Sequence, residues 1–171
     1  MSNKLPQSEL RQTVRRAYDF ACGYCGVRED DVGSELELDH FQPRSLGGGG
    51  ELENLVYCCT TCNRFKGDFW TISTEEKRLL HPQHDDVGLH LRTDSDGLLT
   101  ALTETGKFHL MRLHLNRPPL VALRRARTQN DRLYRELTQA QTAQKLLTQH
   151  LREIDEKIER IYEEIIRLVN K

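Results

Sequence analysis

Two cysteine pairs, Cys22-Gly-Tyr-Cys25 and Cys59-Thr-Thr-Cys62, decide the fold of this chain. Thirty-three residues separate the pairs, and each pair leaves two residues between its thiols. This spacing allows four thiolates to converge on one ion, and four is the number that a closed tetrahedral zinc site takes. Because the protein is expected in a reducing compartment, disulfides are a poor alternative. We therefore predict a structural Zn2+ site whose ligands are Cys22, Cys25, Cys59 and Cys62.

The fifth cysteine, Cys58, directly precedes the second pair. It is either a small core residue or a competitor for a ligand position, and we favour the core. A site closed by four cysteines leaves no coordination position for water or substrate, so this zinc is expected to hold structure only. Any chemistry must then come from other residues.

The segments next to the cysteines predict a small α+β unit. The stretch Glu35–Asp39 alternates apolar and polar residues, as a half-buried strand does, and Asn54–Tyr57 reads as a second strand that returns beside it. Thr60 or Thr61 can cap a short helix that Gly67 would end. The predicted order is strand, loop, strand and helix.

A helix is expected before the first cysteine pair. Apolar residues recur at helical spacing from Ser8 to Ala21, and Ser8 is a suitable N-cap. The other face carries Arg11, Arg15 and Arg16, which can meet phosphate or simply be solvated. The sequence leaves this choice open.

The residues enclosed by the cysteines are of the kinds that bind a hard cation and move a proton. They occur in Leu38-Asp-His-Phe-Gln-Pro-Arg44, at Asn54, and in Cys62-Asn-Arg-Phe-Lys-Gly67. His40 is followed after 13 residues by Asn54 and after 8 more by Asn63, with Asp39 as the acidic neighbour of His40. In these positions the chain resembles the HNH endonuclease family, and in particular its cysteine-supported bacterial or phage branch.

The resemblance is strong over residues 8–67 and weaker from Gly97 to Arg125. It implies a ββα-metal finger and a metal-dependent endonuclease that hydrolyses DNA phosphodiester bonds, leaving 5′-phosphate and 3′-hydroxyl ends. The family often has a second histidine where this chain has Asn63. That difference favours a harder ion, Mg2+ or Mn2+, at the catalytic site.

The residue chemistry agrees with these roles. His40 is the side chain suited to take a proton from water near pH 7, because an unperturbed imidazole titrates near 6.5. Asp39 and Asn63 offer the oxygen ligands that a catalytic Mg2+ or Mn2+ requires. Asn54 is expected to support catalysis by pinning the loop after His40. Glu37, on the same strand face as Asp39, can add a hydrogen bond to the site.

Three cations lie where a phosphate oxygen would need them, and we expect them to contact DNA: Arg44, Arg64 and Lys66. Simple solvation is the alternative for each. The other histidines lack a comparable spacing, and the segment 81–86 reads as a polar loop in preference to a metal site.

The rest of the chain divides into an extension and a long helix. Leu89–Thr93 and Leu98–Leu102 are expected to form a hairpin, and Phe108–Leu115 a helix. No Gly or Pro follows Pro119, so one helix of about 50 residues can reach the end. We expect a nuclease core over 1–72, an accessory α+β region over 73–117 and a coiled-coil helix over 118–171.

The last helix carries a heptad pattern. Counted from Leu123 to Leu168, twelve of the fourteen a and d positions are apolar, and Asn130 and Gln144 are the two polar ones. A single helix cannot bury such a stripe, so we expect a homodimer through residues 123–168, or alternatively a helix of a partner protein. An arginine cluster at residues 124–135 could add DNA contacts.

The charge balance limits how the chain can bind nucleic acid. Lys and Arg total 25 against 26 for Asp and Glu, so bulk positive charge is excluded as the basis of binding. This motivates an alternative function, a non-cleaving zinc-supported nucleic-acid-binding module or a nuclease subunit active only with a partner protein. No run of ~20 apolar residues suggests a membrane span, and a cytoplasmic protein is expected.

Overall fold

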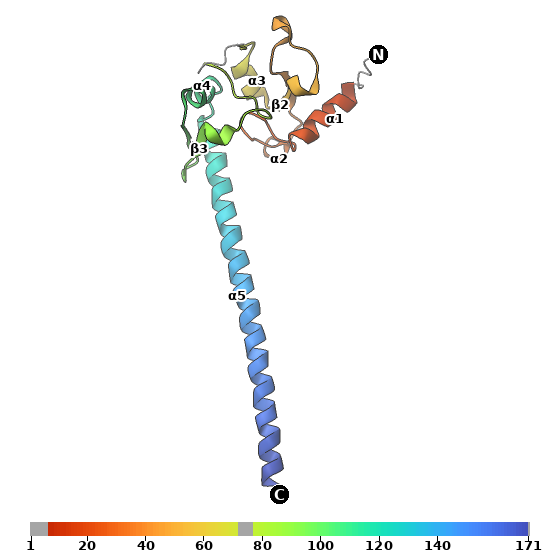
Figure 1. Ribbon diagram of the computed structural model, residues 1–171, viewed down its shortest axis with the longest axis vertical. Coiled ribbons are helices and arrows are strands. Elements are labelled where there is room, and N and C mark those ends of the chain that lie inside the picture. Colours follow the sequence, from red (N-terminus) through yellow and green to blue (C-terminus); the bar gives the residue numbers. More distant parts are fainter. Residues whose placement is uncertain (1–6, 72–76, 171) are drawn as a thin grey trace. The chain divides into compact units, whose positions relative to one another are not determined.

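The computed structural model describes residues 7–71 and 77–170 (Figure 1). It separates into two units, Met1–Arg125 and Ala126–Lys171. Within the described residues, no helix is long and apolar enough to span a membrane.

The first unit opens with helix α1 (Gln7–Ala17), which ends four residues before the predicted end at Ala21. The chain leaves the helix through Asp19 and Phe20, which have positive φ angles of 49° and 58°. Left-handed backbone cannot continue a right-handed helix, so the chain turns at once into the first cysteine knuckle. The short helix α2 (Glu29–Val32) follows, ended by Gly33 in the left-handed conformation.

Strand β1 (Glu37–His40) pairs antiparallel with strand β2 (Leu55–Cys58), and His40 lies opposite Leu55. The loop between them contains two short 3-10 turns, Arg44–Leu46 and Leu52–Asn54. Helix α3 (Thr60–Lys66) comes directly after β2 and ends at Gly67, as expected. The strand, loop, strand and helix therefore follow one another in the predicted order, with strand boundaries moved by one or two residues.

The cap of α3 differs from the prediction. Cys59, and neither Thr60 nor Thr61, is the N-cap, and its Sγ accepts a hydrogen bond from the backbone N–H of Cys62. A thiolate can cap a helix because the first N–H groups have no partner within the helix. The second cysteine pair therefore shapes the start of α3 as well as the cluster.

The extension forms a second hairpin and a helix. Strand β3 (Leu91–Thr93) pairs with β4 (Leu99–Ala101) across the predicted turn, where Asp94 Oδ1 accepts from the N–H groups of Asp96 and Leu98. A 3-10 turn, Val87–Leu89, precedes β3. Helix α4 (Glu104–Arg112) begins four residues earlier than predicted because Thr103 supplies an N-cap hydroxyl. Positive φ at His114 follows its end.

One hydrophobic core joins the segment with the cysteines to the extension. Strand β2 is buried on both faces, and Leu113, Leu115 and Leu120 belong to the same cluster as its side chains. The described part of the extension, residues 77–117, thus packs against the part of the chain that carries the candidate site.

Helix α5 (Pro118–Val169) is continuous over 52 residues, as the sequence predicts. In the second unit, the large apolar side chains of the heptad stripe are all exposed, and the least exposed of them, Ile158, has 45% of its surface accessible. These residues are Leu133, Leu137, Leu147, Leu151, Ile154, Ile158, Ile161, Ile165 and Leu168.

Candidate zinc centre and catalytic pocket

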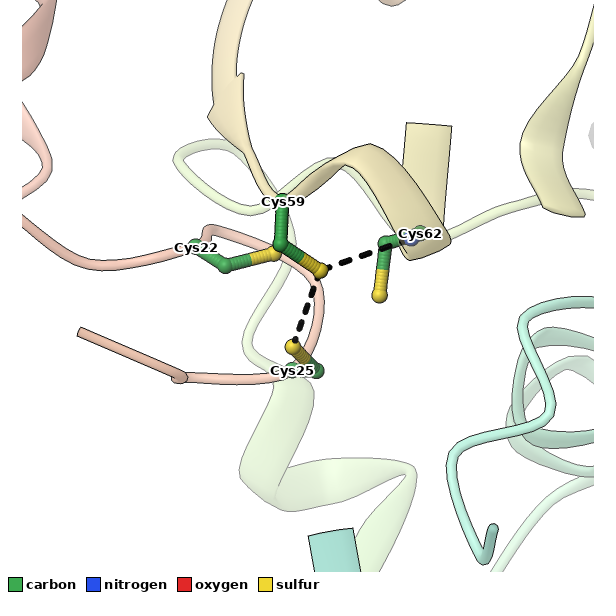
Figure 2. Close-up of side chains that lie close together, drawn as sticks. All are labelled: Cys22, Cys25, Cys59 and Cys62. Atoms are coloured by element: carbon green, nitrogen blue, oxygen red, sulfur yellow. Dashed lines mark hydrogen bonds between the residues drawn. The ribbon is translucent and has the colours of Figure 1, made fainter. Parts of the chain in front are cut away.

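The four predicted zinc ligands lie together (Figure 2). The Sγ atoms of Cys22, Cys25, Cys59 and Cys62 are all within 4.8 Å of one another, and those of Cys25 and Cys59 are 3.8 Å apart. Zn–S bonds of about 2.3 Å in a tetrahedron separate the sulfurs by about 3.8 Å. The donor set and its spacing therefore fit a structural zinc ion, which the four cysteines can hold.

An arginine that the sequence reasoning did not identify lies against this cluster. Arg117 directs Nη2 to the sulfurs of Cys62, Cys59 and Cys25 at 3.4, 3.8 and 3.9 Å. Its Nη1 donates to the carbonyl oxygens of Leu113 and His114. A zinc ion held by the four thiolates would carry two net negative charges, which this guanidinium would partly compensate.

Cys58 is a core residue, as favoured from the sequence. Its side chain is fully buried within the hydrophobic cluster and is not part of the four-sulfur group. Burial raises the pKa of the Cys58 thiol, which keeps it neutral.

A polar pocket of about 400 Å³ lies beside α3. Five residues singled out from the sequence line it together: Asp39, His40, Arg44, Asn63 and Lys66. They come from the end of β1, the first turn of the following loop, and α3. The structure thus brings together the acid, the imidazole and the amide that the HNH resemblance assigns to one site.

Asp39 has both carboxylate oxygens engaged. Tyr24 donates its hydroxyl to Oδ2 at 2.8 Å, and Lys66 Nζ lies 3.0 Å from Oδ1. Burial raises the pKa of Asp39, while Lys66 and the Tyr24 hydrogen bond oppose that rise. Tyr24 stands inside the first cysteine pair, so the zinc knuckle contacts the acid of the pocket directly.

Lys66 occupies a different environment from the one expected. Its side chain is fully buried, and Nζ also donates to the carbonyl oxygens of His40 and Gly67. In this arrangement the ammonium group neutralises Asp39 from inside the protein. A buried ion pair of this kind needs all of its hydrogen bonds, because an unpaired charge in the interior is costly.

His40 lies at the end of β1 and accepts a hydrogen bond at Nε2 from Arg44 Nε, at 3.0 Å. An imidazole nitrogen that accepts from a guanidinium carries a lone pair, so the proton of the neutral ring is on Nδ1. Burial, together with Arg44 and Lys66, lowers the pKa of His40. Arg44 itself is exposed, and Arg64 is exposed on α3 but does not line this pocket.

Asn63 is oriented by Glu37. Its Nδ2 donates to Glu37 Oε2 at 2.7 Å, and Glu37 Oε1 accepts from the Thr60 hydroxyl. Because the amide nitrogen is held by Glu37, the Asn63 carbonyl oxygen is left for another partner. Cys62 and Asn63 are adjacent on α3, so one helix presents a sulfur to the zinc cluster and an amide to the pocket.

Asn54 does not line this pocket and instead ties the ends of the loop together. Its Oδ1 accepts from the Gln42 N–H, and its Nδ2 donates to the carbonyl oxygens of Gln42 and Gly49. These are the loop-pinning contacts expected of Asn54. They fix the segment that follows His40.

Comparison with known families adds an independent finding. Residues 22–69 match the HNH endonuclease family. The matched segment holds both cysteine pairs and all of the pocket residues that the sequence singled out. No curated protein and no solved structure matches the chain significantly. The HNH domain points to a nuclease in general, in a family that uses metal ions and binds DNA.

Three features of the site were not predicted from the sequence: the Tyr24 contact to Asp39, the burial of Lys66, and the contact of Arg117 with the sulfurs. The sequence offered weak signals for two of them. Tyr24 lies between two ligands, and Arg117 lies in the Asn-Arg-Pro stretch of the weaker resemblance. Neither position reveals its contact, because each depends on a partner far away in the chain.

Proposed function

We propose that this protein is a metal-dependent HNH endonuclease that hydrolyses DNA phosphodiester bonds at the pocket of His40. The observation that carries the proposal is that Asp39, His40, Arg44 and Asn63 line one pocket within residues 22–69. Hydrolysis needs a base for water, compensation of charge on the phosphoryl oxygens, and a group that positions the phosphate.

The oxygen donors suit a Mg2+ or Mn2+ ion. Asp39 and the free carbonyl of Asn63 would hold it, with water filling the remaining positions, as is usual for Mg2+ in proteins. Such an ion compensates negative charge on a phosphoryl oxygen and on the leaving oxygen. Lys66 competes for Asp39, so metal binding is expected to be weak without substrate.

His40 and Arg44 have linked roles in this proposal. The lone pair on His40 Nε2, now held by Arg44, is the acceptor for the proton of the attacking water. An incoming phosphate offers Arg44 a stronger, charged partner than a neutral imidazole. When Arg44 moves to the phosphate, Nε2 becomes free to accept the proton, so substrate binding itself prepares the base.

Plasmid nicking with Mg2+ or Mn2+ tests this function. Changing His40 to Ala is expected to lower the rate about 10²- to 10⁴-fold, the usual range for loss of a general base. The matched control is His150→Ala, an exposed histidine on α5, which should cut like the wild type. Bound zinc, measured by elemental analysis, must stay equal in all three proteins. Cutting by purified His40→Ala at the wild-type rate contradicts the proposal.

We further propose that the enzyme is a homodimer through residues 123–168 of α5. The support is the exposed apolar stripe of the second unit, which a partner helix with the same heptad pattern would bury. Asn130 and Gln144 at a positions favour a defined register. A protein with Ile158 and Ile165 both changed to Asp should run as a monomer in light scattering and keep its zinc. The control, Glu159→Asp on the same helix, should remain a dimer.

One observation favours the alternative of a nuclease that works only with a partner protein. Both oxygens of Asp39 are already occupied, by Tyr24 and Lys66. If the purified protein is inert with Mg2+, Mn2+ and other divalent ions while His40 and zinc are intact, this alternative replaces the free-standing enzyme. A partner that binds α5 would then be the first candidate activator.

A further inference from the structure

A second pocket, of about 640 Å³, adjoins the loop that follows His40. His40 lines the catalytic pocket, and the next residue, Phe41, lines this one. Since consecutive side chains of an extended segment point to opposite sides, one short segment serves both pockets. The pinned ends of the loop, at Gln42 and Asn54, line the second pocket as well.

Aromatic rings make up much of its wall. Phe41 meets Trp70 edge-on at 5.6 Å between ring centroids and His81 at 4.4 Å. The rings of His81 and His84 are stacked 4.1 Å apart, and His84 is exposed. These rings offer flat faces of the kind on which nucleobases stack.

The two pockets differ in charge. Both charged side chains that line the aromatic pocket are acidic, Glu51 and Glu53, whereas the catalytic pocket has the cations Arg44 and Lys66 beside its acids Asp39 and Asp68. A phosphate group is therefore disfavoured in the aromatic pocket. An uncharged ring that carries amino groups suits it, because carboxylates accept hydrogen bonds from exocyclic amines.

His81 supplies an additional polar group. Its side chain is only 6% exposed, and its Nδ1 accepts from the Gln83 N–H, so the proton of the neutral ring is on Nε2. That Nε2 is buried beside the backbone of Glu53, which acts on the ring as a hydrogen-bond partner although the contact is not a well-formed hydrogen bond.

We propose that the aromatic pocket binds one unpaired nucleobase of the nucleic acid whose phosphate enters the catalytic pocket. This inference rests on the proposed nuclease function. The base stacks on Trp70 and His84, and its amino group donates to Glu51 or Glu53. The site thus prefers cytosine, adenine or guanine to thymine, and it favours single-stranded or locally opened DNA over an intact duplex.

Fluorescence gives a direct test, because Trp70 is the only tryptophan of the chain. The zinc-loaded protein is titrated without added Mg2+, so that no cutting occurs. Oligodeoxycytidine is expected to quench Trp70 saturably, with several-fold weaker binding for oligothymidine and for a duplex of the same length. His84→Ala should weaken oligodeoxycytidine binding about 5- to 150-fold, which corresponds to the stacking energy of one base.

One control variant and one further test variant complete the experiment. His150→Ala should bind like the wild type, and equal zinc content and far-UV circular dichroism show that His84→Ala is folded. Glu51→Gln should reduce the preference for cytosine over thymine while leaving oligothymidine binding unchanged. If His84→Ala binds oligodeoxycytidine like the wild type and Glu51→Gln keeps the preference for cytosine, the proposal that this pocket binds a nucleobase is wrong.

Ligand comparisons identify the occupant. Deoxycytidine monophosphate should bind much more weakly than the oligonucleotide, since it lacks the neighbouring nucleotides whose phosphodiester enters the catalytic pocket. Equal affinity for the mononucleotide would assign the pocket to a free nucleotide and overturn the proposal. Quenching by choline at similar concentrations would assign it to an organic cation, with the same consequence. A nicking-competent protein with no Trp70 response refutes this inference alone, whereas a Trp70 response without nicking refutes only the nuclease.

Discussion

The cysteine cluster and the catalytic pocket share helix α3, which contributes Cys62 to one and Asn63 to the other. They differ in how many of their charged groups already have a partner within the protein. The four sulfurs lie within 4.8 Å of one another, and the guanidinium of Arg117 contacts three of them. In the pocket, by contrast, Asp39 is already paired with Lys66 and Tyr24. The first site offers four sulfurs that an ion could hold together, whereas the second is neutralised by its own side chains.

The difference suggests a division of labour between two metals. A soft ion that stays bound completes the first site and holds the chain together. A hard ion at the second site has to compete with an ammonium group, which fits an ion that arrives with its substrate.

The largest effect is expected from losing the zinc ligands. Cys62→Ser should unfold most of residues 7–125, because structural zinc contributes on the order of 10 kcal/mol in small zinc domains. Zinc content, measured by elemental analysis, should fall, and the near-UV circular dichroism should collapse. Cys58→Ser changes the neighbouring core cysteine and should keep its zinc, which separates loss of a ligand from loss of a buried thiol. Retention of zinc and fold by Cys62→Ser would remove the basis of the comparison.

Lys66→Met tests whether the pocket neutralises itself. It leaves the buried Asp39 without its cation, so the free energy of unfolding should fall by about 3–5 kcal/mol in urea denaturation. Mg2+ should then restore part of the loss, because Asp39 is open to it. Wild-type protein, whose Asp39 is paired, should gain much less from Mg2+. Lys107→Met, which removes an exposed lysine, serves as the control. An unchanged stability of Lys66→Met would mean that Asp39 is not held by this ion pair.

A smaller effect is expected when the charge over the sulfurs is removed. Arg117→Gln deletes the guanidinium that contacts three sulfurs, so zinc should transfer to a chelator several-fold faster. Arg117→Lys should restore part of the retention, because it keeps the charge. The release rate is followed with a coloured zinc chelator, and Arg64→Gln on the exposed face of α3 is the control. Identical release from Arg117→Gln and wild type would show that the contact does not act on the zinc.

The smallest effect is expected for an ion pair that belongs to neither site. It gives a reference value for an ion pair outside both sites. Glu29 bonds to Arg15 and Tyr57, and chiefly the Arg15 hydrogen bond lowers its pKa to about 2, from an ordinary value of 4.5. Since the folded pKa lies below the unfolded one, the stabilisation is present above about pH 4.5. It is lost as the pH falls toward 2.

Thermal melts between pH 6 and pH 3 measure this contribution. Glu29→Gln should be less stable than the wild type at pH 6, and the gap should narrow as the pH falls. Comparing the two proteins at each pH cancels the loss of zinc in acid, which affects both. A gap that stays constant or widens toward pH 3 contradicts the assigned ion pair.

The arginines of α1 show how far the sequence could go. From the sequence, Arg11 and Arg15 could either bind phosphate or be solvated. In the structure, Arg11 forms an ion pair with Glu35, and Arg15 forms one with Glu29. Glu35 lies 24 residues after Arg11 and Glu29 lies 14 residues after Arg15, so no local pattern predicts these partners. Arg124 and Arg125 of the C-terminal cluster likewise donate to the backbone of Gly97 and Asp96.

Local patterns succeeded wherever the physics is local. The spacing of the cysteines predicted that four sulfurs lie together, and they do. Gly67 predicted the end of α3, and the absence of Gly and Pro after Pro119 predicted a continuous α5. The order of the elements and the zinc ligands could therefore be written from the sequence, since each follows from spacing, capping or backbone conformation. Which charged group meets which, including Lys66 with Asp39, Tyr24 with Asp39 and Arg117 with the sulfurs, was decided only by the tertiary structure. Long, flexible side chains have many partners within reach, and only packing selects one of them.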